Sequence, residues 1–142
     1  MTIAAIVERK GAEVVTVEAD AAVREAVDLL AGRRIGAVVV LDRGEVAGIL
    51  SERDILYCLA SDGGAVLDLP VSRVMSAPAV TAGPDVSVLA ALSDMSKRRI
   101  RHLPVVEGGR LAGLVSIGDL VAYRIRRIEE EAEAMRTYIQ SA

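Results

Sequence analysis

Two pairs of serine and aspartate have residue types and a spacing suited to ligand chemistry. Ser51 and Asp54, and again Ser116 and Asp119, stand three residues apart, each after an apolar run. A serine at the start of a helix lies beside free backbone N–H groups, which suit a phosphate. A carboxylate can accept hydrogen bonds from two adjacent ribose hydroxyls. The same spacing is also typical of a simple helix cap, so these residues alone leave ligand contact and capping as equal alternatives.

Both pairs belong to an internal duplication. Arg33–Ile55 reads RRIGAVVVLDRGEVAGILSERDI and Arg98–Leu120 reads RRIRHLPVVEGGRLAGLVSIGDL, at an offset of 65 residues without a gap. Val15-Thr16 matches Val80-Thr81 at the same offset. Two copies are fewer than the roughly three units that a solenoid needs. A unit of about 60 residues is marginal alone, so we expect a pseudo-symmetric pair that shares its core.

Each unit is predicted to contain the elements β-α-β-β-α. In the first unit we expect strands at 14–17, 37–41 and 46–50 and a helix after Asp20, its N-cap. Ser51 and Asp54 then open a second helix as a capping box. The second unit repeats this order, with Asp85 as the first cap and strands at 80–81, 103–106 and 111–115. Apolar leading segments precede the units at 3–7 and 71–75, and residues 8–13 are expected to form a loop that the second unit lacks.

The last helix is predicted to run on past the repeat, over 121–142. Its apolar residues alternate four and three apart, as in a coiled-coil seam, at Val121, Ile125, Ile128, Ala132, Met135 and Ile139. Arginines at 124, 126 and 127 precede glutamates at 129–131 and 133, an order that opposes the helix dipole. Laid antiparallel on a second copy, the basic half meets an acidic half. We therefore favour a homodimer contact over packing of the helix on its own domain.

Composition excludes several classes of protein. Hydrophobic residues make up 52% of the 142 residues, with no Phe or Trp, so aliphatic side chains must fill the core. No apolar run approaches the ~18 residues of a spanning helix, and no secretion signal is present, so we expect no membrane partner. The single cysteine, Cys58, is expected to be a buried, inert thiol and indicates a reducing, cytoplasmic location. A net charge of −3 makes nucleic acid an unexpected partner.

The sequence also gives no support for an enzyme. It has one histidine, one cysteine and no P-loop lysine motif, so we expect no metal and no catalytic cofactor. His102 is expected to be a strand residue without a catalytic role. The basic stretch at 97–102 is explained first by a helix C-terminus and second by attraction of phosphate.

The motif G-h-h-S-x-x-D after a hairpin, at Gly48–Asp54 and again at Gly113–Asp119, resembles that of the CBS domain. Residues 71–81 look like the first strand of that family. The resemblance covers residues 3–127 and implies an α/β (α+β) fold. Two β-α-β-β-α repeats, at 3–62 and 70–127, would pack through their sheets as a stand-alone tandem pair (a Bateman module), with a C-terminal helix at 121–142.

The resemblance implies a non-catalytic regulatory module. CBS pairs bind adenine nucleotides such as AMP, ADP, ATP, NAD or S-adenosylmethionine in clefts between the repeats, and AMP is the ligand that we favour. They signal to a regulated protein, here unidentified, by changing shape, and often form disc-like dimers. The alternative is a scaffold with empty clefts that dimerises or recruits a partner through its C-terminal helix.

The family's site residues carry over to two clefts, each with serine and aspartate from one repeat and threonine and the adenine-lining strand from the other. Cleft A would be formed by Thr16, Ile35, Gly36, Ala37, Ser116, Ile117 and Asp119. Cleft B would be formed by Thr81, Ile100, Arg101, His102, Ser51, Arg53 and Asp54. Gly36-Ala37 stands where the other copy has Arg101-His102, so we expect unequal clefts. Val39, in place of Pro104, should also alter the shape of the first copy.

Overall fold

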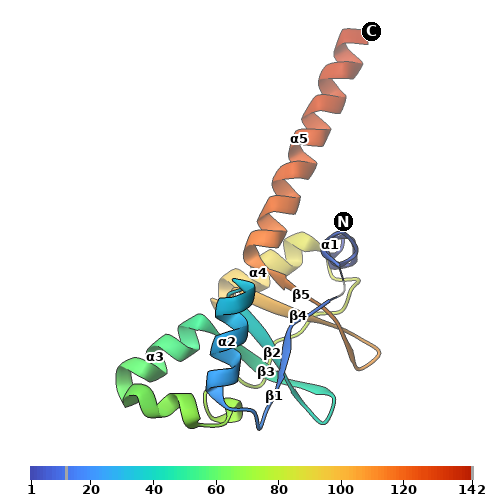
Figure 1. The fold of residues 1–142 in the computed structure, drawn as a ribbon. Coiled ribbons are helices and arrows are strands. Elements are labelled where there is room, and N and C mark those ends of the chain that lie inside the picture. The colour runs from blue at the N-terminus through green and yellow to red at the C-terminus, as the bar shows by residue number, and fades with distance from the viewer. Residues whose placement is uncertain (12, 142) are drawn as a thin grey trace.

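The computed structural model describes residues 1–11 and 13–141, and Figure 1 shows the arrangement of the elements. In order these are α1 (Ile3–Lys10), β1 (Thr16–Glu18), α2 (Val23–Arg33), β2 (Ala37–Asp42), β3 (Glu45–Ser51), α3 (Glu52–Asp62), the 3₁₀ turns η1 (Gly63–Asp68) and η2 (Val71–Arg73), α4 (Val88–Arg98), β4 (His102–Glu107), β5 (Arg110–Ser116) and α5 (Ile117–Ser141). No described helix is both long enough and apolar enough to cross a membrane.

Each repeat contains a β-hairpin, and the two hairpins share one register. β2 pairs antiparallel with β3, with Ala37 opposite Ser51, and β4 pairs with β5, with His102 opposite Ser116. The first hairpin gains a third strand, β1, which runs parallel to β2. The duplication seen in the sequence is therefore also a duplication of backbone pairing.

The strand predicted at 80–81 is wrong. In the second repeat only Ala82 forms a parallel bridge to β4. In the first repeat the N–H of Val39 donates to the carbonyl of Val15 at 3.2 Å. The equivalent of Val39 is Pro104, which has no N–H to donate. The ladder is one hydrogen bond shorter there, so the segment remains extended without becoming a strand.

The leading segments also differ from the prediction. The expected first strand of the second repeat is the 3₁₀ turn η2, and the loop expected at 8–13 is in part the end of α1. Ile3 and Ile6 are buried in α1, at the three-residue spacing of a helical face. The helical spacing was missed because residues 3–7 were matched to 71–75, which were expected to form a strand.

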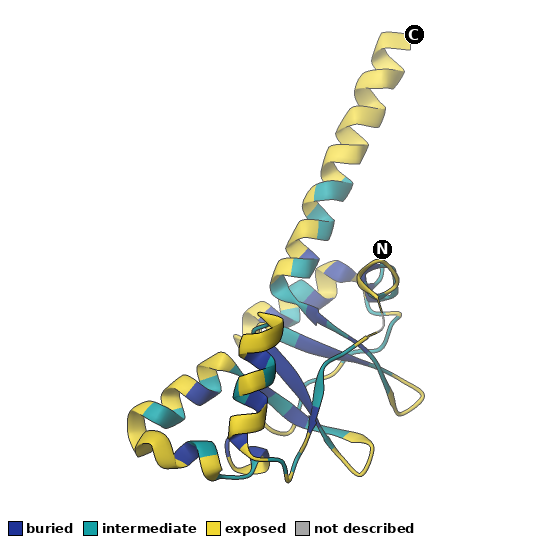
Figure 2. Cartoon of the chain, in the orientation of Figure 1, coloured by how far each residue is buried: buried dark blue, intermediate teal, exposed yellow. Residues whose placement is uncertain are grey.

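Each leading segment packs into the core of the other repeat. Ile3 and Ile6 join the cluster around Val88, Met95 and Leu120 in the second repeat. The first repeat's core in turn takes in two valines from the second leading segment, at 71 and 74. Figure 2 shows both cores as buried strands and inner helix faces, while most of α5 is exposed. The repeats are thus held together by an exchange of short apolar segments.

This exchange explains where α2 and α4 begin. The predicted caps, Asp20 and Asp85, are wrong, because the helices start later, after Ala22 and Ser87. Each of these two residues has extended backbone and forms an antiparallel bridge with the segment that precedes the other repeat, at Pro70 and Thr2. Pairing holds the chain extended and delays the helix.

The glycine of each G-h-h-S-x-x-D motif makes room for a leading segment. A Cβ on Gly48 would lie 2.6 Å from the carbonyl oxygen of Ser76 and 2.8 Å from the sulfur of Met75. A Cβ on Gly113 would lie 3.0 Å from both methyl groups of Val7. The first contact is with backbone, which cannot move aside as a side chain can.

We expect Gly48→Ala to lower the free energy of unfolding by about 1–3 kcal/mol, because the added methyl group overpacks the junction. Gly32→Ala is the matched control. Gly32 lies in α2 with no atom within 4 Å of its Cβ position, so alanine there should stabilise the protein by up to about 1 kcal/mol. Urea unfolding of both variants measures the difference. Equal midpoints would show that the junction tolerates a side chain.

Candidate ligand-binding site

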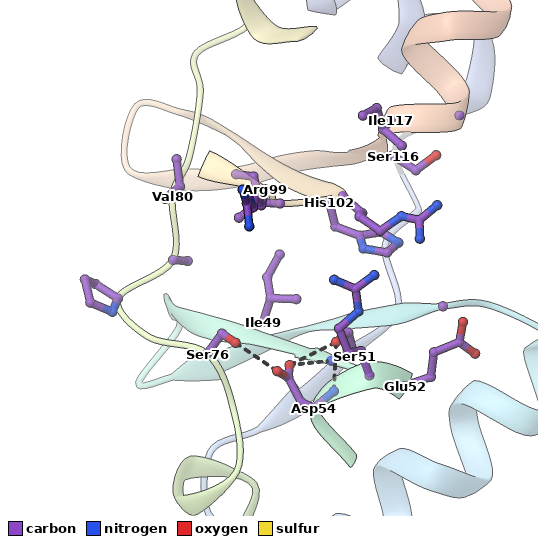
Figure 3. Close-up of a pocket in the computed structure, with 17 residues that line it drawn as sticks. Ile49, Ser51, Glu52, Asp54, Ser76, Val80, Arg99, His102, Ser116 and Ile117 are labelled. Atoms are coloured by element: carbon purple, nitrogen blue, oxygen red, sulfur yellow. Dashed lines mark hydrogen bonds between the residues drawn. The ribbon is translucent and has the colours of Figure 1, made fainter. Parts of the chain in front are cut away.

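A cavity of about 520 Å³ lies between the two repeats (Figure 3). Both hairpins end there, and the helices that follow them, α3 and α5, both start at its wall. The lining residues are Gly36, Ile49, Ser51, Glu52, Arg53, Asp54, Ser76, Pro78, Ala79, Val80, Arg99, Ile100, Arg101, His102, Ser116, Ile117 and Gly118. The cavity therefore combines two helix N-termini, several basic groups and an apolar wall.

Asp54 is fixed in place by the first turn of α3. Its Oδ2 accepts hydrogen bonds from the backbone N–H and the hydroxyl of Ser51, both at 3.0 Å, and the Ser51 hydroxyl accepts from the N–H of Asp54 at 3.2 Å. This capping box confirms the predicted cap. The other carboxylate oxygen of Asp54, Oδ1, accepts a hydrogen bond from the hydroxyl of Ser76 at 3.0 Å, as the dashed lines in Figure 3 show. A carboxylate oxygen can accept two hydrogen bonds, so Oδ1 keeps capacity for a ligand hydroxyl.

Three arginines bring positive charge to the cavity. Arg53 comes from α3, while Arg99 and Arg101 lie between α4 and β4. Among the described residues, none of these three has a carboxylate within 4.0 Å. Glu52 and Asp54 are the acidic residues of the lining, so the basic groups outnumber them and the cavity suits an anion.

His102 lines the cavity and is close enough to Lys10 and Asp119 to be affected by their charges. Its Nε2 is 3.5 Å from the Cβ position of Gly36, an ordinary van der Waals distance, so the imidazole lies against the start of the first hairpin. Burial is the main cause that lowers the pKa of His102 below 6.5; the charges of Lys10 and Arg101 lower it further, against a smaller opposing effect of the carboxylates of Asp119 and Glu52. The ring is therefore neutral at pH 7 and offers one donor and one acceptor.

Asp119 has a different partner from Asp54. Its Oδ2 accepts from the N–H of Ser116 at 2.9 Å, which repeats the cap of α3. The same oxygen accepts from the Lys10 ammonium at 2.7 Å, and that ammonium also donates to the carbonyl of Leu114 at 3.0 Å. Burial by itself would raise the pKa of Asp119, but the hydrogen bonds from Lys10 and from the Ser116 N–H outweigh it, so the pKa is lowered.

The predicted site residues divide between the cavity and its surroundings. Every residue assigned to cleft B lines the cavity except Thr81, which is exposed. From cleft A, Gly36, Ser116 and Ile117 line the same cavity. The other cleft A residues lie outside it. Thr16 is paired in β1, Ile35 packs on the first core, Ala37 is buried, and Asp119 is held by Lys10.

The lining also contains residues that the sequence reasoning missed. Ser76, Pro78, Ala79 and Val80 come from the second leading segment and the chain after it. No local pattern marks them, because they reach the cavity only through the exchange between repeats. Arg99 had a visible signal, since it belongs to the basic stretch at 97–102, for which attraction of phosphate was the second explanation.

The chain matches the family described as CBS domain twice, over residues 6–61 and 71–126. It is 41% identical to the CBS-domain protein ATU1752 of Agrobacterium tumefaciens, whose crystal structure superimposes with a TM-score of 0.83 over 87% of this chain and 99% of that one. It is 35% identical over 126 residues to the mitochondrial protein CBSX3 of Arabidopsis thaliana. That alignment covers 85% of this chain and 61% of the length of CBSX3.

A third comparison concerns the fold alone. The CBS domain pair of protein MJ0100, solved in complex with 5′-methylthioadenosine and S-adenosyl-L-methionine, is 23% identical and superimposes with a TM-score of 0.79 over 89% of this chain and 98% of that one. The duplicated motif, the paired hairpins and the matches to both repeats agree: this chain belongs to the CBS domain family and carries two copies of that domain.

Proposed function

We propose that the protein is a non-catalytic regulatory module, acting in the cytoplasm, that binds an adenine nucleotide in the cavity between its repeats. AMP is the first candidate, followed by ADP and ATP, with NAD or S-adenosylmethionine as further members of the class. The observation that carries the proposal is the pairing, in one cavity, of a fixed carboxylate at Asp54 with three arginines that no described carboxylate approaches within 4.0 Å. The adenosyl ligands of the MJ0100 pair support the same class of ligand.

Each part of a nucleotide has a matching group in the cavity. Asp54 Oδ1 would accept a ribose hydroxyl beside Ser76. Ile49, Val80 and Ile100 supply an apolar wall for adenine. The phosphate would meet Arg53, Arg101 and the backbone of Gly118 in the first turn of α5. The N–H groups of Ile117 and Asp119 on either side already donate to Arg101 and Ser116.

Charge favours a phosphorylated ligand over S-adenosylmethionine. A sulfonium cation would face guanidinium groups, whereas one or more phosphates would neutralise them. Two helix N-termini add partial positive charge on the same side. This is the physical ground for ranking AMP, ADP and ATP first.

Binding between the repeats also gives a route for signalling. A ligand that contacts both hairpins can stabilise one arrangement of the repeats over another only if it binds the two arrangements with different affinity. A regulated protein would bind the outer surface of one arrangement of the repeats more tightly than that of the other. We propose this as the output of the module.

The first test is calorimetry with AMP, ATP, NAD and S-adenosylmethionine on wild type and Asp54→Ala. Loss of a charged hydrogen bond of roughly 1.5–3 kcal/mol should weaken AMP binding about tenfold to a hundredfold. Asp62→Ala is the control, because Asp62 is an exposed carboxylate at the far end of the same helix and should leave affinity unchanged. Asp54 also caps α3, so thermal unfolding should accompany the titrations. Absence of binding by every adenylate would refute the proposed function.

His102 provides a second, pH-dependent test. A bound phosphate should raise the lowered pKa of His102, because it stabilises the imidazolium. Binding then takes up a proton, so AMP affinity should increase as the pH falls from neutral towards and below about 6.5. The second pKa of phosphate, near 6, acts in the opposite direction, and His102→Gln isolates that effect. NMR of this single histidine measures the pKa, and a pKa that AMP leaves unchanged would remove His102 from phosphate binding.

The structure offers a second candidate function, assembly through α5. Beyond the body of the protein this helix projects freely (Figure 1), and its seam is exposed: Ile125 by 52%, Ile128 by 49%, Met135 by 60% and Ile139 by 66%. Exposed apolar stripes of this kind are typical of interaction surfaces. We propose that α5 pairs antiparallel with α5 of a second copy, crossing near Ile128, where the arginine block of each helix meets the glutamate block of the other.

Truncation after residue 127 should convert a dimer into a monomer in light-scattering measurements. A double substitution on the seam, Ile128→Asp with Met135→Asp, should do the same, because it places charges in the contact. Ala134→Asp with Thr137→Asp adds the same charges on the opposite face of the helix and should leave the mass unchanged. A truncated chain that keeps the mass of the full chain would show that α5 does not hold copies together.

A further inference from the structure

The last turn of α1 contacts the motif aspartate of cleft A. Lys10 lies there, and its ammonium forms the 2.7 Å ion pair with Asp119 and the 3.0 Å hydrogen bond to Leu114. Its side chain is 44% exposed, whereas that of Asp119 is 29% exposed. The lysine therefore pairs with a half-buried carboxylate, while its own side chain stays partly accessible to solvent.

In cleft B no described cation forms an ion pair with the motif aspartate, Asp54. Val7 and Met75 occupy equivalent places, each beside the motif glycine of the other repeat, and the two chains diverge after them. After Met75 the chain is extended, and the first side chain to reach the motif aspartate is the hydroxyl of Ser76, which leaves the cavity open. After Val7 the helix runs on to Lys10. The extra residues of the first repeat thus bring a cation to Asp119, where the second repeat brings a neutral hydroxyl to Asp54.

We propose that Lys10 is a built-in occupant of cleft A, that its ammonium stands where the ribose hydroxyls of an adenylate would bind Asp119, and that each chain therefore takes one adenylate, in cleft B, until Lys10 is displaced. The proposal rests on the proposed function for the identity of its ligand. It assigns Lys10 as the residue that sets the number of working sites.

Competition explains why Lys10 prevails. Ribose hydroxyls and the ammonium both donate to an ionised carboxylate, but the ammonium adds the attraction between two opposite charges, so ribose hydroxyls are poor replacements for it. We expect cleft A to bind at least about tenfold more weakly than cleft B. Because the Lys10 side chain is partly exposed, it can swing into solvent without unfolding α1, so the block is reversible.

The same cation acts on the open cavity. The charge of Lys10 is one of the causes that lower the pKa of His102. Displacing Lys10 from cleft A would therefore raise that pKa and favour imidazolium in the cavity. This couples the two clefts through charge alone, with no change in the backbone.

The test compares wild type with Lys10→Met, which keeps the apolar stem and removes the charge. Calorimetry with AMP should give one site per chain in wild type and two in Lys10→Met, and Lys10→Met with Asp119→Ala should return to one. Arg9→Met is the matched control, since Arg9 lies on the same helix, is exposed, and should leave one site. A single site in Lys10→Met would overturn the proposal.

A second measurement needs no ligand. Carbon-13 NMR of the aspartate carboxyls should show a lowered pKa for Asp119 in wild type and a higher one in Lys10→Met, with the pKa of His102 rising as well. Unchanged values would show that the ion pair does not form in solution, which would also overturn the proposal. If no variant binds any adenylate while the pKa of Asp119 still responds to Lys10→Met, the proposed function fails and the Lys10–Asp119 contact stands.

Discussion

The exchange of leading segments between the repeats is the constraint on which the rest of the structure depends. Neither hairpin has enough apolar surface of its own to form a stable core, and each is completed by a few residues from the other repeat, Ile3 and Ile6 in one direction and Val71 and Val74 in the other. The two motif glycines let these segments cross the sheets at close range. A pair built in this way cannot separate into two domains without opening both cores.

The exchange also decides what each motif aspartate meets. Because a leading segment passes directly over the hairpin of the other repeat, its next residues reach the start of the helix that follows that hairpin. Ser76 reaches Asp54 and Lys10 reaches Asp119. The two motif aspartates therefore accept the same backbone cap bond but have different partners, a serine hydroxyl at Asp54 and a lysine ammonium at Asp119.

The open cavity obtains its electrostatic character from the same arrangement. Two helix N-termini and three arginines converge because both hairpins end at the seam between the repeats. Burial and the neighbouring cations lower the pKa of His102 and keep it neutral. An anionic group would neutralise part of this positive charge. This is the physical reason for proposing a phosphorylated ligand whose affinity depends on pH.

The sequence alone determined the duplication, both hairpins, the long α5 and, through the repeated motif, the family, because these depend on patterns visible along the chain. It offered helix capping at Ser51 and Ser116 as one of two equal alternatives, and the structure shows both caps. The sequence could not determine where α2 and α4 begin, or that residues of the second leading segment line the cavity, because both depend on backbone pairing with the other repeat. It also did not show the loss of the strand at 80–81, which follows from the missing N–H of Pro104. From the sequence, Lys10 was predicted to lie in a loop that the second repeat lacks. Only the tertiary structure, which lays the last turn of α1 across β5 and the start of α5, brings its charge to an aspartate more than a hundred residues away.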